Sequence, residues 1–117
     1  MPIFKNNSKI QIDLKNKAII IIIRKHFNEK KAKKLKIFVE KLKFQYNFYT
    51  FIIILPKKIK FTNKVRQILM DFIKEQNLIV IPSPIQRAIL KTEAVFTEED
   101  TDYICNSEKE ALNRMNI

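Results

Sequence analysis

The stretches AIIIII at residues 18–23 and FIIIL at residues 51–55 decide the fold of this chain. Both are short, continuous and rich in β-branched isoleucine, which is typical of strands buried on both faces of a sheet. Residues 28–46 lie between them and carry apolar side chains at helical spacing, which predicts a long amphipathic helix. A strand, a helix and a second strand form a βαβ unit, so the two stretches are expected to pair in parallel.

The apolar pattern extends this unit in both directions. Residues 9–14 alternate apolar and polar side chains up to Leu14, and a turn at 15–17 predicts an antiparallel hairpin with residues 18–23. The second buried strand is expected to start at Phe48. Beyond it, the sequence predicts a helix from Thr62 to about Asn77, a strand at 78–81, a helix from Ser83 to about Lys91, an extended segment at 94–96, an edge strand at 102–105 and a closing helix at 107–115.

Polar residues at the predicted helix starts support these boundaries. Asn28, Thr62 and Ser83 are good N-cap residues, and proline follows Ser83 at the first helical position. Ser107 and Glu110 have the spacing of a capping box. The predicted fold class is α/β: a single domain over residues 1–117, with a mixed sheet of about five strands flanked by helices in the order ββαβαβαβα.

Composition excludes several kinds of functional site. The 117 residues contain no glycine, so neither a P-loop nor a dinucleotide-binding fingerprint can be built. One cysteine and one histidine cannot form an internal disulfide or a structural zinc site. We interpret His26 as a loop residue, Cys105 as a small buried side chain, Ser83 as a cap and residues 98–102 as an acidic turn. No paired nucleophile and base is recognisable, so we expect neither an enzyme nor a cofactor.

Basic residues are concentrated in the first part of the chain. The formal net charge is +11, but residues 1–66 carry +15 and residues 67–117 carry −4. Two clusters account for most of the excess. The first predicted helix carries Lys30, Lys31, Lys33, Lys34, Lys36, Lys41 and Lys43, and the segment around the start of the second helix carries Lys57, Lys58, Lys60, Lys64 and Arg66.

Several interpretations of this charge remain open. The lysines can form a solvated face, a surface for a protein partner, or a surface for a polyanion such as nucleic acid or an anionic membrane. The opposite signs of the two parts of the chain also allow head-to-tail association into a homo-oligomer. Independently of charge, nine phenylalanines and three tyrosines could fill the core or line a cavity for a small hydrophobic ligand.

The last third of the chain carries a family resemblance. The residues concerned are LIVIPSPI at 78–85, YIC at 103–105 and EKEAL at 108–112. With the predicted order of elements, they resemble the STAS-like domain, the fold of bacterial anti-sigma-factor antagonists, and in particular small bacterial STAS-like proteins. The resemblance implies an interaction module that binds a regulatory partner. It also implies a phosphorylation switch at the start of the second helix, where this chain has Thr62.

We therefore expect a non-catalytic, regulatory protein-interaction module of STAS-like type. Its apolar runs are too short to span a membrane and its first residues do not resemble a secretory signal, so the expected location is the cytoplasm. The alternatives are a nonspecific binder of nucleic acid or anionic lipid and a carrier of a small hydrophobic ligand. Thr62 is the candidate switch, and the candidate partner or polyanion surface consists of Lys30, Lys31, Lys33, Lys34, Lys57, Lys58, Lys60, Lys64 and Arg66.

Overall fold

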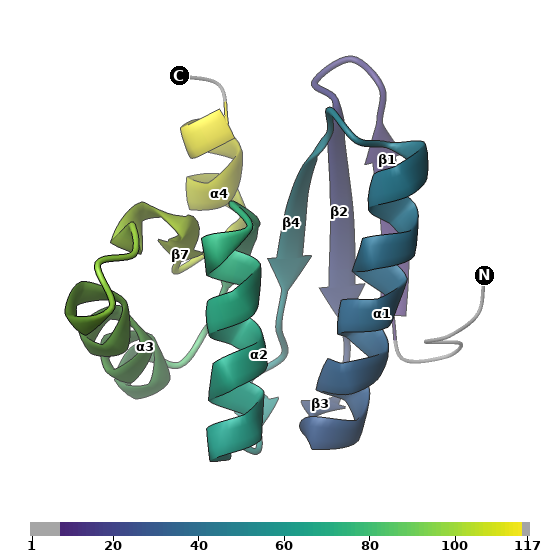
Figure 1. Cartoon of the computed structure of the whole chain (residues 1–117). Helices are drawn as coiled ribbons and strands as arrows, with labels where there is room; N and C mark the ends of the chain where they lie inside the picture. Colours follow the sequence, from purple (N-terminus) through teal and green to yellow (C-terminus); the bar gives the residue numbers. More distant parts are fainter. Residues whose placement is uncertain (1–7, 116–117) are drawn as a thin grey trace.

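The computed structural model describes residues 8–115 and confirms an α/β domain with a mixed sheet (Figure 1). The predicted order of elements is observed, with two additional strands of two residues each, β3 and β5. In chain order the elements are β1 (Ser8–Asp13), β2 (Ala18–Ile23), β3 (His26–Phe27), α1 (Glu29–Gln45), β4 (Thr50–Ile54), β5 (Lys58–Ile59), α2 (Asn63–Lys74), β6 (Leu78–Val80), α3 (Pro84–Phe96), the 3₁₀ turn η1 (Thr101–Tyr103), β7 (Ile104–Cys105) and α4 (Glu108–Met115).

The main sheet has the strand order β1-β2-β4-β6-β7. Strand β1 is antiparallel to β2, and the remaining neighbours are parallel. The two apolar stretches pair as predicted, with Ile19 opposite Phe51 and Ile21 opposite Ile53. Since β2, β4, β6 and β7 run in one direction, their carboxyl ends meet at one edge of the sheet, which we call the carboxyl edge. The opposite edge, where β2 and β4 begin, is the amino edge.

Helices cover both faces of the sheet unequally. Helices α1 and α2 lie side by side on one face (Figure 1), and α3 joins the same core through Leu90 and Ala94, both fully buried. Because each parallel strand is added on the same side of the one before, right-handed crossovers place all three helices on one face. Helix α4 covers part of the other face, where Ala111 packs with Ile52 and Leu78. Within residues 8–115, no helix is long and apolar enough to cross a bilayer.

The predicted N-caps are confirmed by their hydrogen bonds. Each cap oxygen accepts from the backbone N–H three residues later, at 3.0 Å for Asn28, 3.2 Å for Thr62 and 3.3 Å for Ser83. Ser107 accepts from the Glu110 N–H at 3.1 Å. The Glu110 carboxylate accepts from the Asn106 N–H instead of that of Ser107, so only half of the predicted capping box forms.

Three local predictions were wrong. Residues 94–96 are the last turn of α3, because Leu90 and Ala94 lie one helical turn apart and both reach the core. The predicted strand at 102–105 is reduced to Ile104–Cys105, because residues 101–103 form η1, capped by the Asp100 carboxylate. Phe48 and Leu14 lie outside the strands and are 83% and 71% exposed.

Candidate interaction surface

The carboxyl edge is built from the turns that follow β2, β4 and β6. Two of these turns are joined by the small parallel sheet of β3 and β5, in which His26 lies opposite Lys58 and Phe27 opposite Ile59. Beyond this pair, the Lys60 N–H donates to the Phe27 carbonyl at 2.8 Å. The Phe27 ring is fully buried and fixes the turn to the core. The backbone at the carboxyl edge is therefore held by hydrogen bonds between segments distant in sequence.

A shallow hollow of about 430 Å³ lies at this edge. It brings together the turn before α1, the segment around β5 and the first turn of α3. Its lining residues are His26, Phe27, Asn28, Lys57, Lys58, Ile59, Lys60 and Gln86. The Gln86 Nε2 donates to the Ile59 carbonyl at 3.2 Å, whereas its Oε1 is buried without a hydrogen-bond partner among the described residues. Gln86 thus closes the third wall of the hollow and ties the start of α3 to β5.

The electrostatic character of the hollow is uniformly basic. Residues 24–28 and 55–66 carry seven lysines and arginines and no acidic residue. Within residues 8–115, the ammonium groups of Lys57, Lys58 and Lys60 form no salt bridge. The lysines of α1 that have acidic neighbours are different, since they form ion pairs: Lys33 with Glu29, Lys36 with Asp71 and Lys43 with Glu75.

Lys31 has a structural role at the same edge. Its Nζ donates to the His26 carbonyl at 2.7 Å, which ties α1 to the turn before it. Burial lowers the pKa of Lys31, and the positive charge of Lys25 lowers it further. A lysine held in this way is less available to a partner than Lys57, Lys58 and Lys60.

The predicted basic surface is divided in the structure. Lys57, Lys58 and Lys60 line the hollow, whereas Lys30, Lys33 and Lys34 lie along α1. Arg66 is turned toward α3, where it lines a second hollow with Ile89, Thr92, Glu93 and Phe96. Its guanidinium also donates to the Asn63 side chain.

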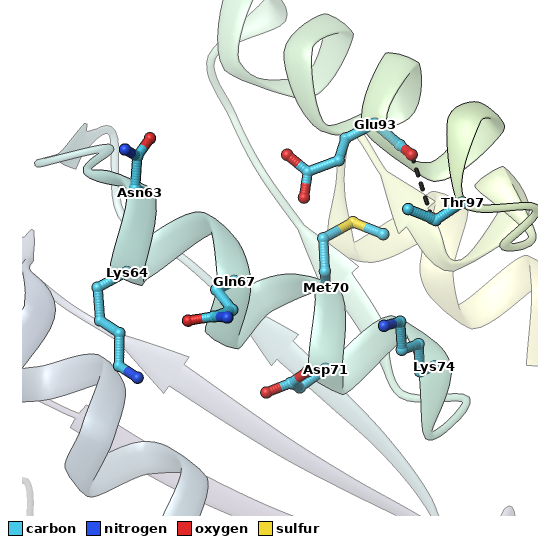
Figure 2. A pocket seen from close by; sticks show the side chains of 8 residues that line it. All are labelled: Asn63, Lys64, Gln67, Met70, Asp71, Lys74, Glu93 and Thr97. Atoms are coloured by element: carbon cyan, nitrogen blue, oxygen red, sulfur yellow. Dashed lines mark hydrogen bonds between the residues drawn. The ribbon is translucent and has the colours of Figure 1, made fainter.

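Lys64 lines a groove of about 580 Å³ along α2 and α3. Figure 2 shows Met70 pointing from α2 toward Glu93 of α3 and toward Thr97, which follows that helix, while Lys64 points away from them. The charges in this groove are mixed, because Asp71 and Glu93 line it together with Lys64 and Lys74. A groove of mixed charge is a weaker anion site than the hollow at the carboxyl edge.

The remaining single residues take structural positions. His26 is exposed in β3, and the Thr62 hydroxyl caps α2 from a half-buried position. Cys105 is fully buried, as predicted, and burial raises the pKa of its thiol to about 11. Of the acidic turn, Asp100 caps η1. In the part of the chain that the structure describes, no three His, Cys, Asp or Glu side chains are grouped so that they could hold a metal ion.

Of the hollow's lining residues, sequence reasoning assigned only its three lysines to the candidate surface and missed His26, Phe27, Asn28, Ile59 and Gln86. Gln86 is the one contributed by α3. Its signal is indirect: Ser83 and Pro84 fix the start of α3, which places Gln86 in the first turn and therefore at the carboxyl edge. Comparison of the chain with protein-family models, with curated proteins and with solved structures finds no match.

Proposed function

We propose that this chain is a non-catalytic, STAS-like interaction module that binds an acidic surface of a regulatory protein at its carboxyl edge. The observation that carries the proposal is the hollow, which Lys57, Lys58 and Lys60 line without an acidic partner among the described residues. Three ammonium groups on a backbone held by hydrogen bonds present a positive surface before any partner arrives. Pre-ordered charge of this kind favours fast and selective association with an acidic patch.

The fold supports the STAS-like part of the proposal. The observed order of elements is the one on which the resemblance rests, and the hollow lies beside the start of α2, where the resemblance places a phosphorylation switch. Thr62 is the N-cap residue immediately before that helix. A phosphate on Thr62 would add negative charge within the basic segment 57–66 and would oppose binding of an acidic partner. The proposed setting is the bacterial cytoplasm.

The chemistry of the hollow favours a protein over nucleic acid. Its cations are lysines, which lack the planar guanidinium that forms paired hydrogen bonds with bases and phosphates. Of its lining residues, Phe27 is fully buried and cannot stack on a base, which leaves the imidazole of His26 as the single exposed ring. Lysine ammonium groups suit carboxylates on a protein surface, which need neutralisation but no fixed planar geometry.

The proposal can be tested with poly-L-glutamate, a soluble acidic polypeptide. We expect amide NMR shifts at residues 24–28, 57–66 and 83–86 on titration. The variant K57A/K58A/K60A should bind about tenfold more weakly or worse, whereas the matched variant K30A/K34A/K41A should change affinity by less than about threefold. Both variants remove three positive charges from the same net +11, so overall charge cannot explain a difference.

Two results would contradict this function. Equal losses in the two triple variants would mean that binding follows net charge and not the hollow. Tighter binding to duplex DNA than to polyglutamate, with a steep loss of affinity as salt rises, would instead support the nonspecific polyanion binder, because each neutralised phosphate releases counterions.

A further inference from the structure

The outer face of α1 combines lysines with exposed apolar side chains. Lys30, Lys34, Ile37, Lys41 and Phe44 follow one another at intervals of three or four residues, so they lie along one side of the helix. The opposite side packs into the core through Ala32, Leu35, Phe38 and Val39. The apolar members of the outer face are well exposed: Ile37 to 53% and Phe44 to 92%.

The apolar part of this face continues at the amino edge of the sheet. Phe48 follows α1 and is 83% exposed, and Leu14, in the turn between β1 and β2, is 71% exposed. The two turns that carry these residues are adjacent, because the Thr50 N–H donates to the Lys17 carbonyl at 2.9 Å. The end of α1 and the β1–β2 turn lie together at the top of Figure 1.

The surroundings of these apolar side chains are basic. Residues 14–28 and 41–70 contain no acidic residue, and Lys15 and Lys17 are exposed beside Leu14. The carboxylate next to Leu14, that of Asp13, accepts hydrogen bonds from Asn16 within the turn. Of the two acidic residues of α1, Glu29 is paired with Lys33 at 3.3 Å. The other, Glu40, lies one turn after Lys36, on the side of α1 next to α2. Within residues 8–115, Lys30, Lys34 and Lys41 form no salt bridge.

We propose that the outer face of α1 docks on an anionic lipid bilayer. Lys30, Lys34 and Lys41 would lie among the negative headgroups, and Phe44 and Phe48 would insert at the boundary of the acyl chains. Exposed phenylalanines next to lysines match the two attractions that hold a protein on such a surface, apolar burial and charge. A second copy of the chain could meet this face only through its residues 67–117, whose net charge is −4, and it would do so against the +11 that each copy carries, so a bilayer is the better occupant.

This surface is separate from the hollow at the carboxyl edge and rests on different side chains. Binding at one does not require binding at the other, so either proposal can fail alone. Long lysine side chains can also reach headgroups while their stems lie against apolar surface. The lysines and the phenylalanines of this face can therefore contact the bilayer at the same time. With α1 on the bilayer, its first turn brings the carboxyl edge close to the membrane surface.

Vesicle binding tests the proposal. The full chain is mixed with vesicles of phosphatidylcholine alone, or of phosphatidylcholine and phosphatidylserine at about 3 to 1, and the bound fraction is measured by sedimentation. We expect binding to the anionic vesicles only. The variant F44A/F48A should lose about tenfold or more in affinity, and K30A/K34A/K41A about a hundredfold at low salt.

Matched variants separate this face from general properties of the chain. The pair Ile85→Ala and Phe96→Ala removes side chains that are 74% and 83% exposed on α3 and should leave vesicle binding within about twofold. K57A/K58A/K60A should cost less than about fivefold. The proposal is overturned if wild type does not bind anionic vesicles, if it binds neutral vesicles equally well, or if the matched variants lose as much affinity as those of α1.

Discussion

Lys36 of α1 donates a hydrogen bond of 2.7 Å from its Nζ to the Asp71 carboxylate of α2. This contact joins the two helices that cover the same face of the sheet, and both side chains are about one-third exposed. The hydrogen bond to Asp71 raises the pKa of Lys36 above its ordinary value of 10.5, and the charges of Asp71, Glu40 and Glu75 act in the same direction.

Removing either partner should weaken the domain modestly. We expect Lys36→Met and Asp71→Asn each to lower the free energy of unfolding by about 0.5–1 kcal/mol, because the pair is partly screened by water. The double variant should lose less free energy of unfolding than the two single variants lose together. Urea unfolding of wild type, the two single variants and the double variant would measure this difference. Strict additivity would show that the contact contributes nothing to stability.

The same pair has a defined pH dependence. Because the pKa of Lys36 is raised in the folded state, its contribution is complete below pH 10.5 and is lost as pH rises through the raised pKa. The stability difference between wild type and Lys36→Met should therefore shrink as pH rises through the raised pKa, above 10.5. A difference that stays constant between about pH 8 and pH 12 would contradict this assignment.

The ends of α2 and α3 have left-handed backbone without glycine. Gln76 has φ 65° and Glu98 has φ 59°, and each follows the last turn of its helix. In both cases the next residue donates back to the helix, Asn77 to the Phe72 carbonyl at 2.9 Å and Glu99 to the Ala94 carbonyl at 2.7 Å. This is the Schellman arrangement, in which glycine usually occupies the left-handed position.

Glycine at these positions should stabilise the protein. We expect Gln76→Gly and Glu98→Gly each to raise the free energy of unfolding by about 0.5–1 kcal/mol, since the left-handed strain removed exceeds the entropy that glycine adds to the unfolded chain. Gln76→Ala retains a Cβ and should give no such gain. Thermal and urea unfolding would measure all three variants, and a loss of stability with glycine would show that side-chain contacts outweigh the strain.

Repeated apolar patterns made most of the fold predictable. The parallel pairing of residues 18–23 with 51–55, the hairpin before it and the starts of α1, α2 and α3 all depend on spacing that the sequence displays directly. The small sheet of His26–Phe27 and Lys58–Ile59 was not predictable, because two residues are too few to show a period. The end of α3 was missed because the residue at its left-handed position is Glu98 and not glycine.

The candidate site was predictable only in part. Sequence reasoning identified the lysines but treated them as one surface, whereas helical geometry directs Lys30 and Lys34 outward from α1 and the turn after β4 carries Lys57 and Lys58 to the hollow. Phe48 was assigned to a buried strand because an apolar residue beside an apolar stretch gives no sign of exposure. Its 83% exposure depends on where β4 begins, which is set by pairing with β2.

Thr62 provides a test of the cap and of the proposed switch together. Thr62→Ala should lower the free energy of unfolding by about 1 kcal/mol, because the Val65 N–H loses its acceptor. Thr62→Ser retains a hydroxyl acceptor and should therefore retain most of the wild-type stability. Thr62→Asp keeps an acceptor and places negative charge at the helix start, so stability should hold while affinity for polyglutamate falls several-fold. If Thr62→Asp binds polyglutamate as tightly as wild type, Thr62 does not control this surface.

The thiol of Cys105 should be protected until the protein unfolds. Cys105 is fully buried in β7, and a thiol reagent at about pH 8 should modify it only in urea. Burial raises the pKa of this thiol from 9.0 to about 11. Between these two pH values the thiol is deprotonated in the unfolded chain but still protonated in the folded one, so the free energy of unfolding falls as pH rises. Cys105→Ala should remove this part of the fall, which urea unfolding at several pH values would show. Rapid modification of the native protein, or identical pH profiles of wild type and Cys105→Ala, would contradict the buried thiol.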